Sequence, residues 1–248
     1  ALHFNFENNI EVHTMSQLSS RGSGLGVSSS IAVSLVAAFA RMRRMVDGAE
    51  EVGDDSQDIA NAAAHVELNL LRRPIGRQDH QAAAWGSLRF YYFDGNKSWV
   101  GHTHSDDDAR WLASHLLLVQ LPDGHDARAI LSGVQRAEQV QASYDAVPLA
   151  VKAVEDRDAE LLGRALDMCH ASKRSIPGAV PRNVAEIVDH LQCDVEGVHG
   201  VKVCGAGGGG HLVVCCEPGA IESVRAETGL PVSVVQADLK GVRSEGWL

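Results

Sequence analysis

The feature that most constrains the fold of this chain is a glycine-rich turn that leads straight into an apolar segment. Glycine occupies every second position of the turn, at Gly22, Gly24 and Gly26, and serine occupies residues 28–30. The segment that follows has apolar residues at Ile31, Leu35, Phe39 and Met42. This spacing is typical of one face of an α-helix. We therefore expect a sharp turn followed at once by a helix.

The turn and the start of the helix together form a candidate anion site. Glycine lacks a Cβ atom, so the backbone can bring amide groups close to a ligand, and the serines can cap the helix. Unpaired amides at a helix N-terminus attract phosphate. No Lys-Ser/Thr pair follows the glycines, and their spacing departs from the dinucleotide fingerprint. We interpret residues 22–29 as a phosphate-binding loop of a less common kind, with a plain structural turn as the alternative.

A second glycine-rich segment lies near the end of the chain. Residues 207–210 are four consecutive glycines, between the apolar runs 201–203 and 211–216, which are typical of strands. Flexible linkers are rich in serine and have polar flanks, which this segment lacks. Glycines between strands are typical of a backbone that passes close to a ligand or to another segment. The sequence therefore favours a functional loop here.

Two carboxylates are candidates for chemistry. Glu67 lies on an alanine-rich edge of an expected helix, and Asp79 lies in a polar loop before an alanine run. Phosphoryl transfer requires one carboxylate to hold magnesium and another to accept a substrate proton. A solvated Glu67 and a helix-capping Asp79 are the alternative reading.

Composition excludes several classes of function. The chain has 248 residues, of which 45% are hydrophobic and 22% charged, as in an ordinary globular protein. A net charge of -10 argues against broad electrostatic binding to nucleic acid or to an anionic membrane. No apolar run reaches the roughly 20 residues that span a bilayer. The five cysteines form no Cys-x-x-Cys pair, so we expect buried free thiols in a reducing cytoplasm.

Apolar periodicity indicates an α+β architecture. Alternation of Phe4, Phe6, Ile10 and Val12 predicts a half-buried strand, and residues 57–71 predict a helix with Ile59, Ala63, Val66 and Leu70 inward. Residues 102–108, rich in histidine and aspartate, are expected to be a solvated loop, with adventitious metal binding as the alternative. Further helices are predicted at 126–141, 146–154, 159–170, 181–192 and 220–228, and further strands at 89–93, 116–121, 201–203, 211–216 and 232–235.

Three stretches together resemble the GHMP kinases, the family of galactokinase and of homoserine, mevalonate and phosphomevalonate kinases. Residues 22–29 match the second family motif, whose core is Gly-Leu-Gly-Ser-Ser-Ala, and residues 202–210 match the third, Lys-x-Thr-Gly-Ala-Gly-Gly-Gly. Residues 76–86, Gly-Arg-Gln-Asp-His-Gln-Ala-Ala-Ala-Trp-Gly, are similar to Gly-Lys-Gln-Asp-Gln-Tyr-Ala-Ala-Ala-Phe-Gly of the heptose kinase and fucokinase branch. This last stretch is the most specific of the three.

The resemblance implies an α+β fold of two lobes with ATP between them. It implies a ribosomal S5-like lobe over residues 1–112, lacking its first strands, and a ferredoxin-like lobe over residues 113–248. It also implies that Ser28 and Glu67 bind Mg²⁺, and that Asp79 is the base, with Arg77 beside it. Arg77 could orient Asp79 or contact a substrate phosphate, and a plain surface arginine is the alternative.

The implied ligand contacts fall on two sets of residues. The set implied to wrap the ATP phosphates is Gly22, Ser23, Gly24, Leu25, Gly26, Val27, Ser28 and Ser29. The set implied to contact the sugar is Gln78, Asp79, Gly205, Ala206, Gly207 and Gly208.

The resemblance implies a cytoplasmic kinase that transfers phosphate from ATP to the anomeric C1 hydroxyl of a heptose, a heptose 7-phosphate or a related sugar such as fucose. It implies no nucleic acid or membrane partner and leaves a homodimer open. The family's first motif, an N-terminal strand and loop with sugar contacts, has no counterpart here. Either it was removed, or this is a reduced member without part of its sugar pocket. Val27 and Cys204 also replace the usual serine and threonine, and Ser20 or Arg21 the usual proline.

A non-catalytic sugar- or nucleotide-binding protein of the same fold is the alternative function. The absence of the first motif suits it, whereas Ser28, Glu67 and Asp79 argue against it because all three are present. An amino-acid or isoprenoid alcohol acceptor is a third reading, which the Gln78-Asp79 context disfavours.

Overall fold

The computed structural model describes residues 10–16, 22–47, 55–95, 97–122, 130 and 138–243. The chain divides into two compact units. The first comprises residues 1–18, 26–106 and 238–248, and the second comprises residues 19–25 and 107–237. Neither unit is continuous in sequence. The lobe boundary expected at residue 112 stays a prediction.

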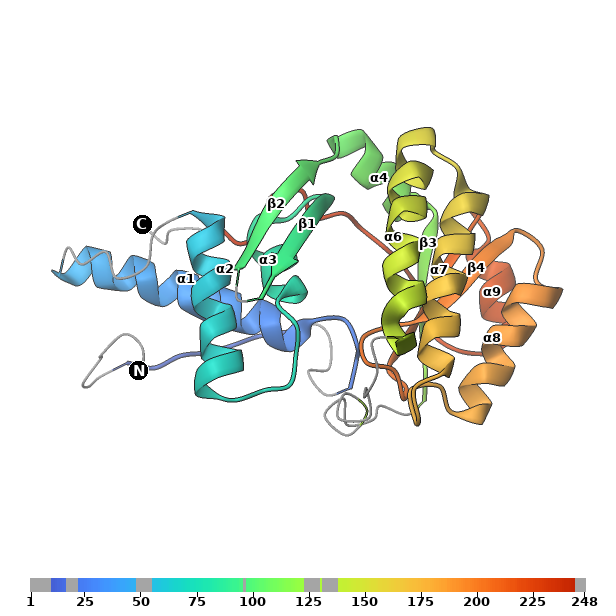
Figure 1. Ribbon diagram of the computed structural model, residues 1–248, viewed down its shortest axis with the longest axis horizontal. Coiled ribbons are helices and arrows are strands. Elements are labelled where there is room, and N and C mark those ends of the chain that lie inside the picture. Colours follow the sequence, from blue (N-terminus) through green and yellow to red (C-terminus); the bar gives the residue numbers. More distant parts are fainter. Residues whose placement is uncertain are drawn as a thin grey trace. The chain divides into compact units, whose positions relative to one another are not determined.

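The first unit combines helices with a two-stranded sheet. Its helical elements are α1 (Val27–Asp47), α2 (Ser56–His65), the π-helical turn η1 (Val66–Leu70) and α3 (Gln78–Trp85), and its strands are β1 (Arg89–Asp94) and β2 (Lys97–Thr103) (Figure 1). Small side chains let α1, α2 and α3 pack closely. This core consists of Val33, Val36, Ala40, Ile59, Ala60, Ala63 and Ala84.

The hairpin and the end of the chain complete this unit. Strands β1 and β2 pair antiparallel, with Arg89 opposite Thr103 and Asp94 opposite Lys97. Residues 238–243 return to the end of α3, where the amide of Val242 donates to the carbonyl oxygen of Ala84 at 3.3 Å. Residues distant in sequence therefore fix the C-terminal end of α3.

The second unit is a four-stranded antiparallel sheet with helices on both faces. Its elements are α4 (Asp106–Ser114), β3 (Leu116–Gln120), α6 (Glu138–Asp156), α7 (Ala159–Arg174), α8 (Arg182–Asp194), β4 (Val198–Val203), β5 (His211–Cys216), α9 (Ile221–Thr228) and β6 (Val232–Val234). The strand order is β4-β5-β3-β6. Successive residues along β3 and β5 face opposite sides of the sheet, as strand geometry requires.

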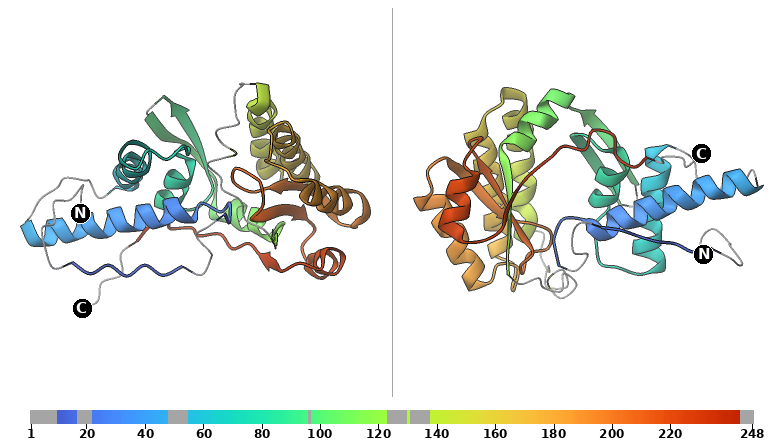
Figure 2. Two further views of the ribbon diagram at one scale, coloured as in Figure 1. Left: turned by 90° about the horizontal axis from the view of Figure 1, so that it is seen from below. Right: turned by 180° about the vertical axis from the view of Figure 1, so that it is seen from behind.

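The two faces bury different apolar clusters. One cluster joins strand residues such as Val119 and Leu212 to α8 and α9, and the other joins Cys215 to α4, α6 and α7. Helices α6 and α7 lie in front of the strands in Figure 1, whereas α9 lies in front of them in the view from behind in Figure 2. Helix α7 touches β4 closely at Gly163, where a Cβ atom would lie 2.1 Å from the backbone oxygen of His199.

Most of the predicted elements are present. The helices expected at 146–154, 159–170, 181–192 and 220–228 and the strands expected at 89–93, 116–121, 201–203, 211–216 and 232–235 are confirmed, with ends shifted by a few residues. The helix expected at 146–154 is longer at both ends and forms α6, which contains Pro148. Most of the helix expected at 126–141 lies outside the described residues. All five cysteines are free thiols, as expected, but only Cys215 and Cys216 are buried, and the expectation of burial is wrong for the exposed Cys193.

Some of the expected structure is wrong. Residues 10–16 form no strand, and Ile10 and Val12 are exposed; Phe4 and Phe6 lie outside the described residues. Residues 97–103 and 106–114 form β2 and α4, where a solvated loop was expected at 102–108. In the part of the chain that the structure describes, no helix is both long and apolar enough to cross a membrane.

The predicted inward faces of two helices also need correction. Leu70 is exposed because the π-helical turn adds a residue per turn and rotates the last positions of the helix outward. Beyond the first turn of α1, the buried positions are Val33, Val36 and Ala40, beside the predicted face rather than on it. Close packing against the alanines of α2 favours these smaller side chains.

Candidate active site

The glycine turn before α1 has the conformation that its sequence requires. Gly22, Gly24 and Gly26 have φ angles of 67°, 72° and 69°, values that side chains with a Cβ atom rarely adopt. The chain passes from the second unit to the first between residues 25 and 26, and α1 begins at Val27. A Cβ atom on Gly26 would lie 3.1 Å from the carboxyl carbon of Asp79. The start of α1 and Asp79 are thus in contact.

Glu67 lies at the centre of a buried polar cluster in the first unit. Its side chain accepts hydrogen bonds from the hydroxyls of Ser28, at 2.7 Å, and Ser29, at 2.9 Å. His80 Nε2 lies 2.9 Å from Glu67 Oε2, and Arg73 Nη1 donates to Oε1 at 2.8 Å. The structure therefore brings together both predicted metal ligands, Ser28 and Glu67, and adds two basic side chains to them.

The π-helical turn places Glu67 in this cluster. Glu67 is the buried residue of η1, and only 2% of its surface is exposed. Leu71 N donates to the carbonyl oxygen of Val66, and Arg73 N donates to that of Glu67, both at 2.9 Å. Arg72, between them, has a φ of 52°, which turns the chain back on itself. Such turns within helices are frequent at functional sites.

Hydrogen bonding keeps Glu67 ionised. Burial alone would raise the pKa of the Glu67 carboxyl, but the hydrogen bonds from His80, Ser28 and Ser29 outweigh it and lower the pKa to about 2. The result is a fixed negative charge next to a serine hydroxyl. Hard oxygen donors of this kind suit magnesium. The Arg73 guanidinium donates to both the Ser28 hydroxyl and Glu67 Oε1, so a cationic group already lies between the two oxygens that would hold a metal ion. The described residues contain no group of three or more His, Cys, Asp or Glu side chains that could hold a metal, so a metal bound here would need further ligands such as phosphate oxygens.

Asp79 occupies the first turn of α3. Asp79 is exposed, but neighbouring segments partly desolvate its carboxyl group, and this desolvation raises its pKa. The negative charge of Glu67 raises the pKa of Asp79 as well. His80 and a hydrogen bond from Gln78 act in the opposite direction. A carboxylate with a raised pKa is a better proton acceptor than an ordinary aspartate.

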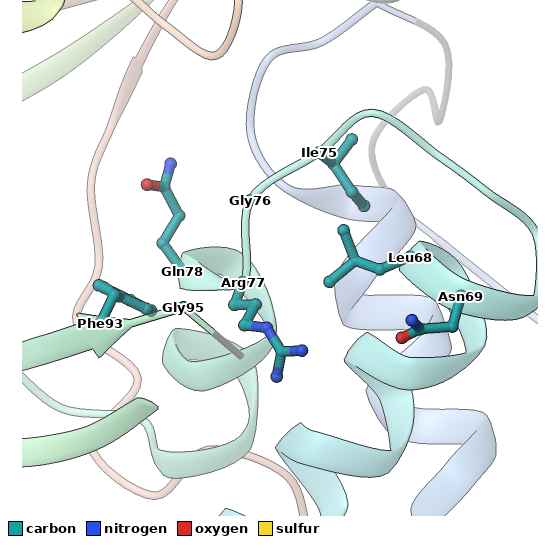
Figure 3. A pocket seen from close by; sticks show the side chains of 8 residues that line it. All are labelled: Leu68, Asn69, Ile75, Gly76, Arg77, Gln78, Phe93 and Gly95. Carbon is teal, nitrogen blue, oxygen red and sulfur yellow. The ribbon is translucent and has the colours of Figure 1, made fainter. Parts of the chain in front are cut away.

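A pocket of about 370 Å³ lies in the first unit, and its lining includes the residues that directly precede Asp79 in the sequence. Its lining comes from η1, the loop before α3 and the end of the hairpin: Leu68, Asn69, Ile75, Gly76, Arg77, Gln78, Phe93 and Gly95. Figure 3 shows that the side chains of Arg77 and Gln78 leave the loop in different directions. Both predicted residues therefore line a cavity.

The two glycine-rich segments meet within the second unit. A Cβ atom on Gly205 would lie 2.6 Å from the Cα atom of Gly24, and one on Gly210 would lie 2.1 Å from the carbonyl oxygen of Gly22. His211 Nδ1 donates to the backbone oxygen of Ser23 at 2.8 Å. Backbone packs directly against backbone here, which only glycine permits.

Lys173 borders the second glycine segment. Its ammonium group donates to the carbonyl oxygen of Gly205. Burial, together with the nearby positive charge of Lys202, lowers the pKa of Lys173 to about 8. The sugar contacts expected of residues 205–208 stay a prediction.

Sequence reasoning did not single out Arg73 or His80. Both are single basic residues in ordinary surroundings, and only the fold shows that they converge on Glu67. His80 follows Asp79 directly, at a position where the similar branch motif has glutamine. Ser29 directs its hydroxyl to Glu67 and is almost fully buried, and its expected contact with ATP stays a prediction.

Comparison with known proteins identifies relatives over most of the chain. Residues 150–228 match the family model for the C-terminal domain of GHMP kinases. The D-glycero-alpha-D-manno-heptose 7-phosphate kinase of Campylobacter jejuni is 29% identical over 234 residues, which cover 88% of this chain and 66% of the relative. The present chain thus spans slightly less than two thirds of the length of that curated relative.

Solved structures share the fold. A D-glycero-D-manno-heptose 1-phosphate kinase from Bacteroides thetaiotaomicron superposes with a TM-score of 0.63 at 19% identity, covering 90% of this chain and 63% of that chain. The mevalonate kinase of Methanococcus jannaschii gives a TM-score of 0.64 at 15% identity, covering 90% and 67%. Residues 150–228 thus match the C-terminal domain of GHMP kinases, and the chain as a whole is similar to a heptose kinase in sequence and to GHMP kinases in its α+β fold.

Proposed function

We propose that this chain carries the phosphoryl-transfer site of an ATP-dependent sugar kinase whose acceptor is the C1 hydroxyl of a heptose, a heptose 7-phosphate or a related sugar such as fucose. The observation that carries the proposal is the cluster at the start of α1. There, Ser28 and an ionised Glu67 lie together, and Asp79 touches the same turn through Gly26. Phosphoryl transfer is catalysed mainly by positioning and by charge stabilisation, and such a cluster can supply both.

Asp79 is the proton acceptor in this proposal. The C1 oxygen attacks the γ-phosphorus of ATP, the bond from that phosphorus to the bridging oxygen breaks, and ADP leaves. The hydroxyl proton passes to the carboxylate of Asp79. The raised pKa of Asp79 suits this role, and an anomeric hydroxyl is already more acidic than an ordinary alcohol.

The remaining residues hold the phosphates. Ser28 and Glu67 would hold a magnesium ion, which supplies positive charge for the phosphate oxygens. Backbone amides of residues 22–29 and the N-terminal end of α1 offset the negative charge that develops on the same oxygens. Positive φ angles through this turn favour amides directed to one side, which supports the assignment.

Two observations favour a sugar acceptor. The heptose 7-phosphate kinase relative aligns over 88% of this chain, and residues 76–86 resemble the heptose kinase and fucokinase branch. The fold alone does not decide, because a mevalonate kinase superposes equally well. Arg77 lines the pocket, and none of the described residues makes a hydrogen bond or ion pair with its side chain, although its backbone oxygen accepts from the amide of Gln81. Its guanidinium suits the phosphate of a phosphorylated sugar.

The test is ADP release with ATP, magnesium and a panel of hexoses, heptoses and their phosphates. We expect turnover with at least one of these sugars, and we expect Asp79→Asn to lower kcat by about 10²- to 10⁴-fold. Asp58→Asn is the matched control, because Asp58 is an exposed carboxylate in the first turn of α2. Binding of ATP without turnover on any sugar would favour the non-catalytic alternative. Equal turnover in the wild type and Asp79→Asn would remove Asp79 from the mechanism.

A further inference from the structure

Arg73 lies at the place where a metal would have to bind. Its Nη1 atom donates both to the hydroxyl oxygen of Ser28 and to Oε1 of Glu67, the two oxygens assigned to magnesium. One nitrogen atom of one side chain thus bridges the predicted ligand pair. A divalent cation that binds both oxygens has to displace this nitrogen.

The position of Arg73 is built into the backbone. The amide of Arg73 donates to the carbonyl oxygen of Glu67, so the same two residues are joined once by main chain and once by side chain. The left-handed conformation of Arg72, with a φ of 52°, makes this return possible. Within the described part of the chain, it is Arg73 and not Arg72 whose side chain pairs with Glu67. The two adjacent arginines therefore differ in role although they carry equal charge.

The buried negative charge of Glu67 requires a cation such as Arg73 beside it. The Glu67 side chain is 3% exposed, and an ionised carboxylate buried to this extent is costly unless it is paired. The Arg73 side chain is 42% exposed, so its guanidinium reaches Glu67 from the solvent side and can leave without breaking the core. The hydroxyl of Ser29 and the ring of His80 remain on the other carboxylate oxygen, Oε2, when it does so.

We propose that Arg73 is a built-in counter-cation that holds Ser28 and Glu67 in their metal-binding arrangement and excludes free divalent metal until metal arrives together with nucleotide. This inference rests on the proposed magnesium site but not on the identity of the sugar. Arg73 acts through Ser28 and Glu67, so it is a positioning residue. The nucleotide phosphates contribute the additional metal ligands that make displacement of the guanidinium favourable.

The test is Mn²⁺ binding in the absence of nucleotide, measured by electron paramagnetic resonance of the free and bound ion. We expect Arg73→Gln to bind one Mn²⁺ at least about tenfold more tightly than the wild type, because removal of the positive charge abolishes competition for Oε1. Arg73→Lys keeps a cation, so we expect it to exclude Mn²⁺ as the wild type does. Arg72→Gln removes the same charge one residue away, so we expect no gain from it.

The double variant Arg73→Gln, Glu67→Gln identifies the site. We expect it to lose the Mn²⁺ gained by Arg73→Gln, provided that far-UV circular dichroism matches the wild type. Equal Mn²⁺ binding by the wild type and Arg73→Gln, or an equal gain in Arg73→Lys or Arg72→Gln, would overturn the proposal. If Arg73→Gln does not fold, strong nucleotide-free Mn²⁺ binding by the wild type or Arg73→Lys would still overturn it.

A kinetic measurement separates this inference from the proposed function. The Mg²⁺ concentration for half-maximal ADP release should fall in Arg73→Gln, whereas Arg72→Gln should match the wild type. An unchanged Mg²⁺ requirement in a wild type and variant that both turn over would refute the role of Arg73 alone. Absence of turnover in every protein would refute the proposed kinase and leave the Mn²⁺ result to decide on Arg73.

Discussion

Replacement of Glu67 by glutamine tests how the polar cluster is stabilised. Lowering the pKa of the Glu67 carboxyl from 4.5 to about 2 corresponds to about 3 kcal/mol of folding free energy at neutral pH. Because the side chain is only 3% exposed, solvent screening reduces this value little. An amide at this position also directs a donor at groups that already donate, namely the hydroxyl of Ser28 or Ser29. We expect Glu67→Gln to lower the free energy of unfolding by about 3 kcal/mol at pH 7.

The pH dependence gives this prediction its sharper form. A carboxyl whose pKa is lowered by folding stabilises the protein above its unfolded pKa, near 4.5, and loses that effect as pH falls through its folded pKa, near 2. The difference between wild type and Glu67→Gln should therefore be constant above about pH 5.5 and shrink steadily below pH 4.5. Other acidic groups titrate in both proteins, so their contributions cancel in the difference.

Urea denaturation followed by far-UV circular dichroism, at several pH values from 3 to 7, measures both quantities. Asp58→Asn is again the matched control, because it exchanges an exposed carboxylate for an amide in the same unit. A loss below about 1 kcal/mol at pH 7, or a difference that does not change between pH 7 and pH 3, would refute the reasoning. Either result would mean that Glu67 is not held ionised by its partners.

Three further expectations concern other parts of the chain. Gly163→Ala should destabilise the second unit by at least about 2 kcal/mol in urea denaturation, because its Cβ atom would overlap a backbone oxygen of β4. Gly178→Ala is the control: its Cβ atom would meet open space, so it should show only the smaller effect of its left-handed φ. Gly26→Ala should lower kcat more than Gly178→Ala does, because its Cβ atom would press on the Asp79 carboxyl group; similar ADP release in the two variants would contradict that contact. Lys173 should be acylated fastest among the lysines in limited labelling with mass spectrometry, with a rate that rises through about pH 8, where its ammonium loses its proton; a midpoint near pH 10.5 would show that burial does not lower its pKa.

The parts of the fold that sequence predicts well are those with a strong local cause. Continuous apolar runs at 116–119 and 212–216 predict strands that are covered on both faces, and the two strands pair with each other in the four-stranded sheet. The glycine segments are also predictable, because the left-handed φ of Gly24 and the backbone contact of Gly205 tolerate little else. By contrast, apolar residues such as Ile10 alternate without forming a strand, because a strand also needs a partner.

The candidate site also contains residues that the sequence identifies and residues that only the fold identifies. Ser28, Glu67 and Asp79 stand out by residue type and by their place next to glycine or alanine. Arg73 and His80 do not, because their importance depends on one extra residue in a helical turn. A regular α-helix through residue 70 would rotate the following residues to other directions, and no local preference of the sequence favours the π-helical turn.

The same geometry connects folding to chemistry. Glu67 collects partners from three places: the start of α1, the return of the chain after η1, and the first turns of α3. None of these segments can satisfy a buried carboxylate alone, because one hydrogen bond does not offset the loss of hydration of a full charge. The ionised form is therefore stable only when all three segments pack together. A pair of oxygens able to hold a metal then exists only in the folded first unit, and Arg73 keeps that pair neutral enough to persist before a ligand binds.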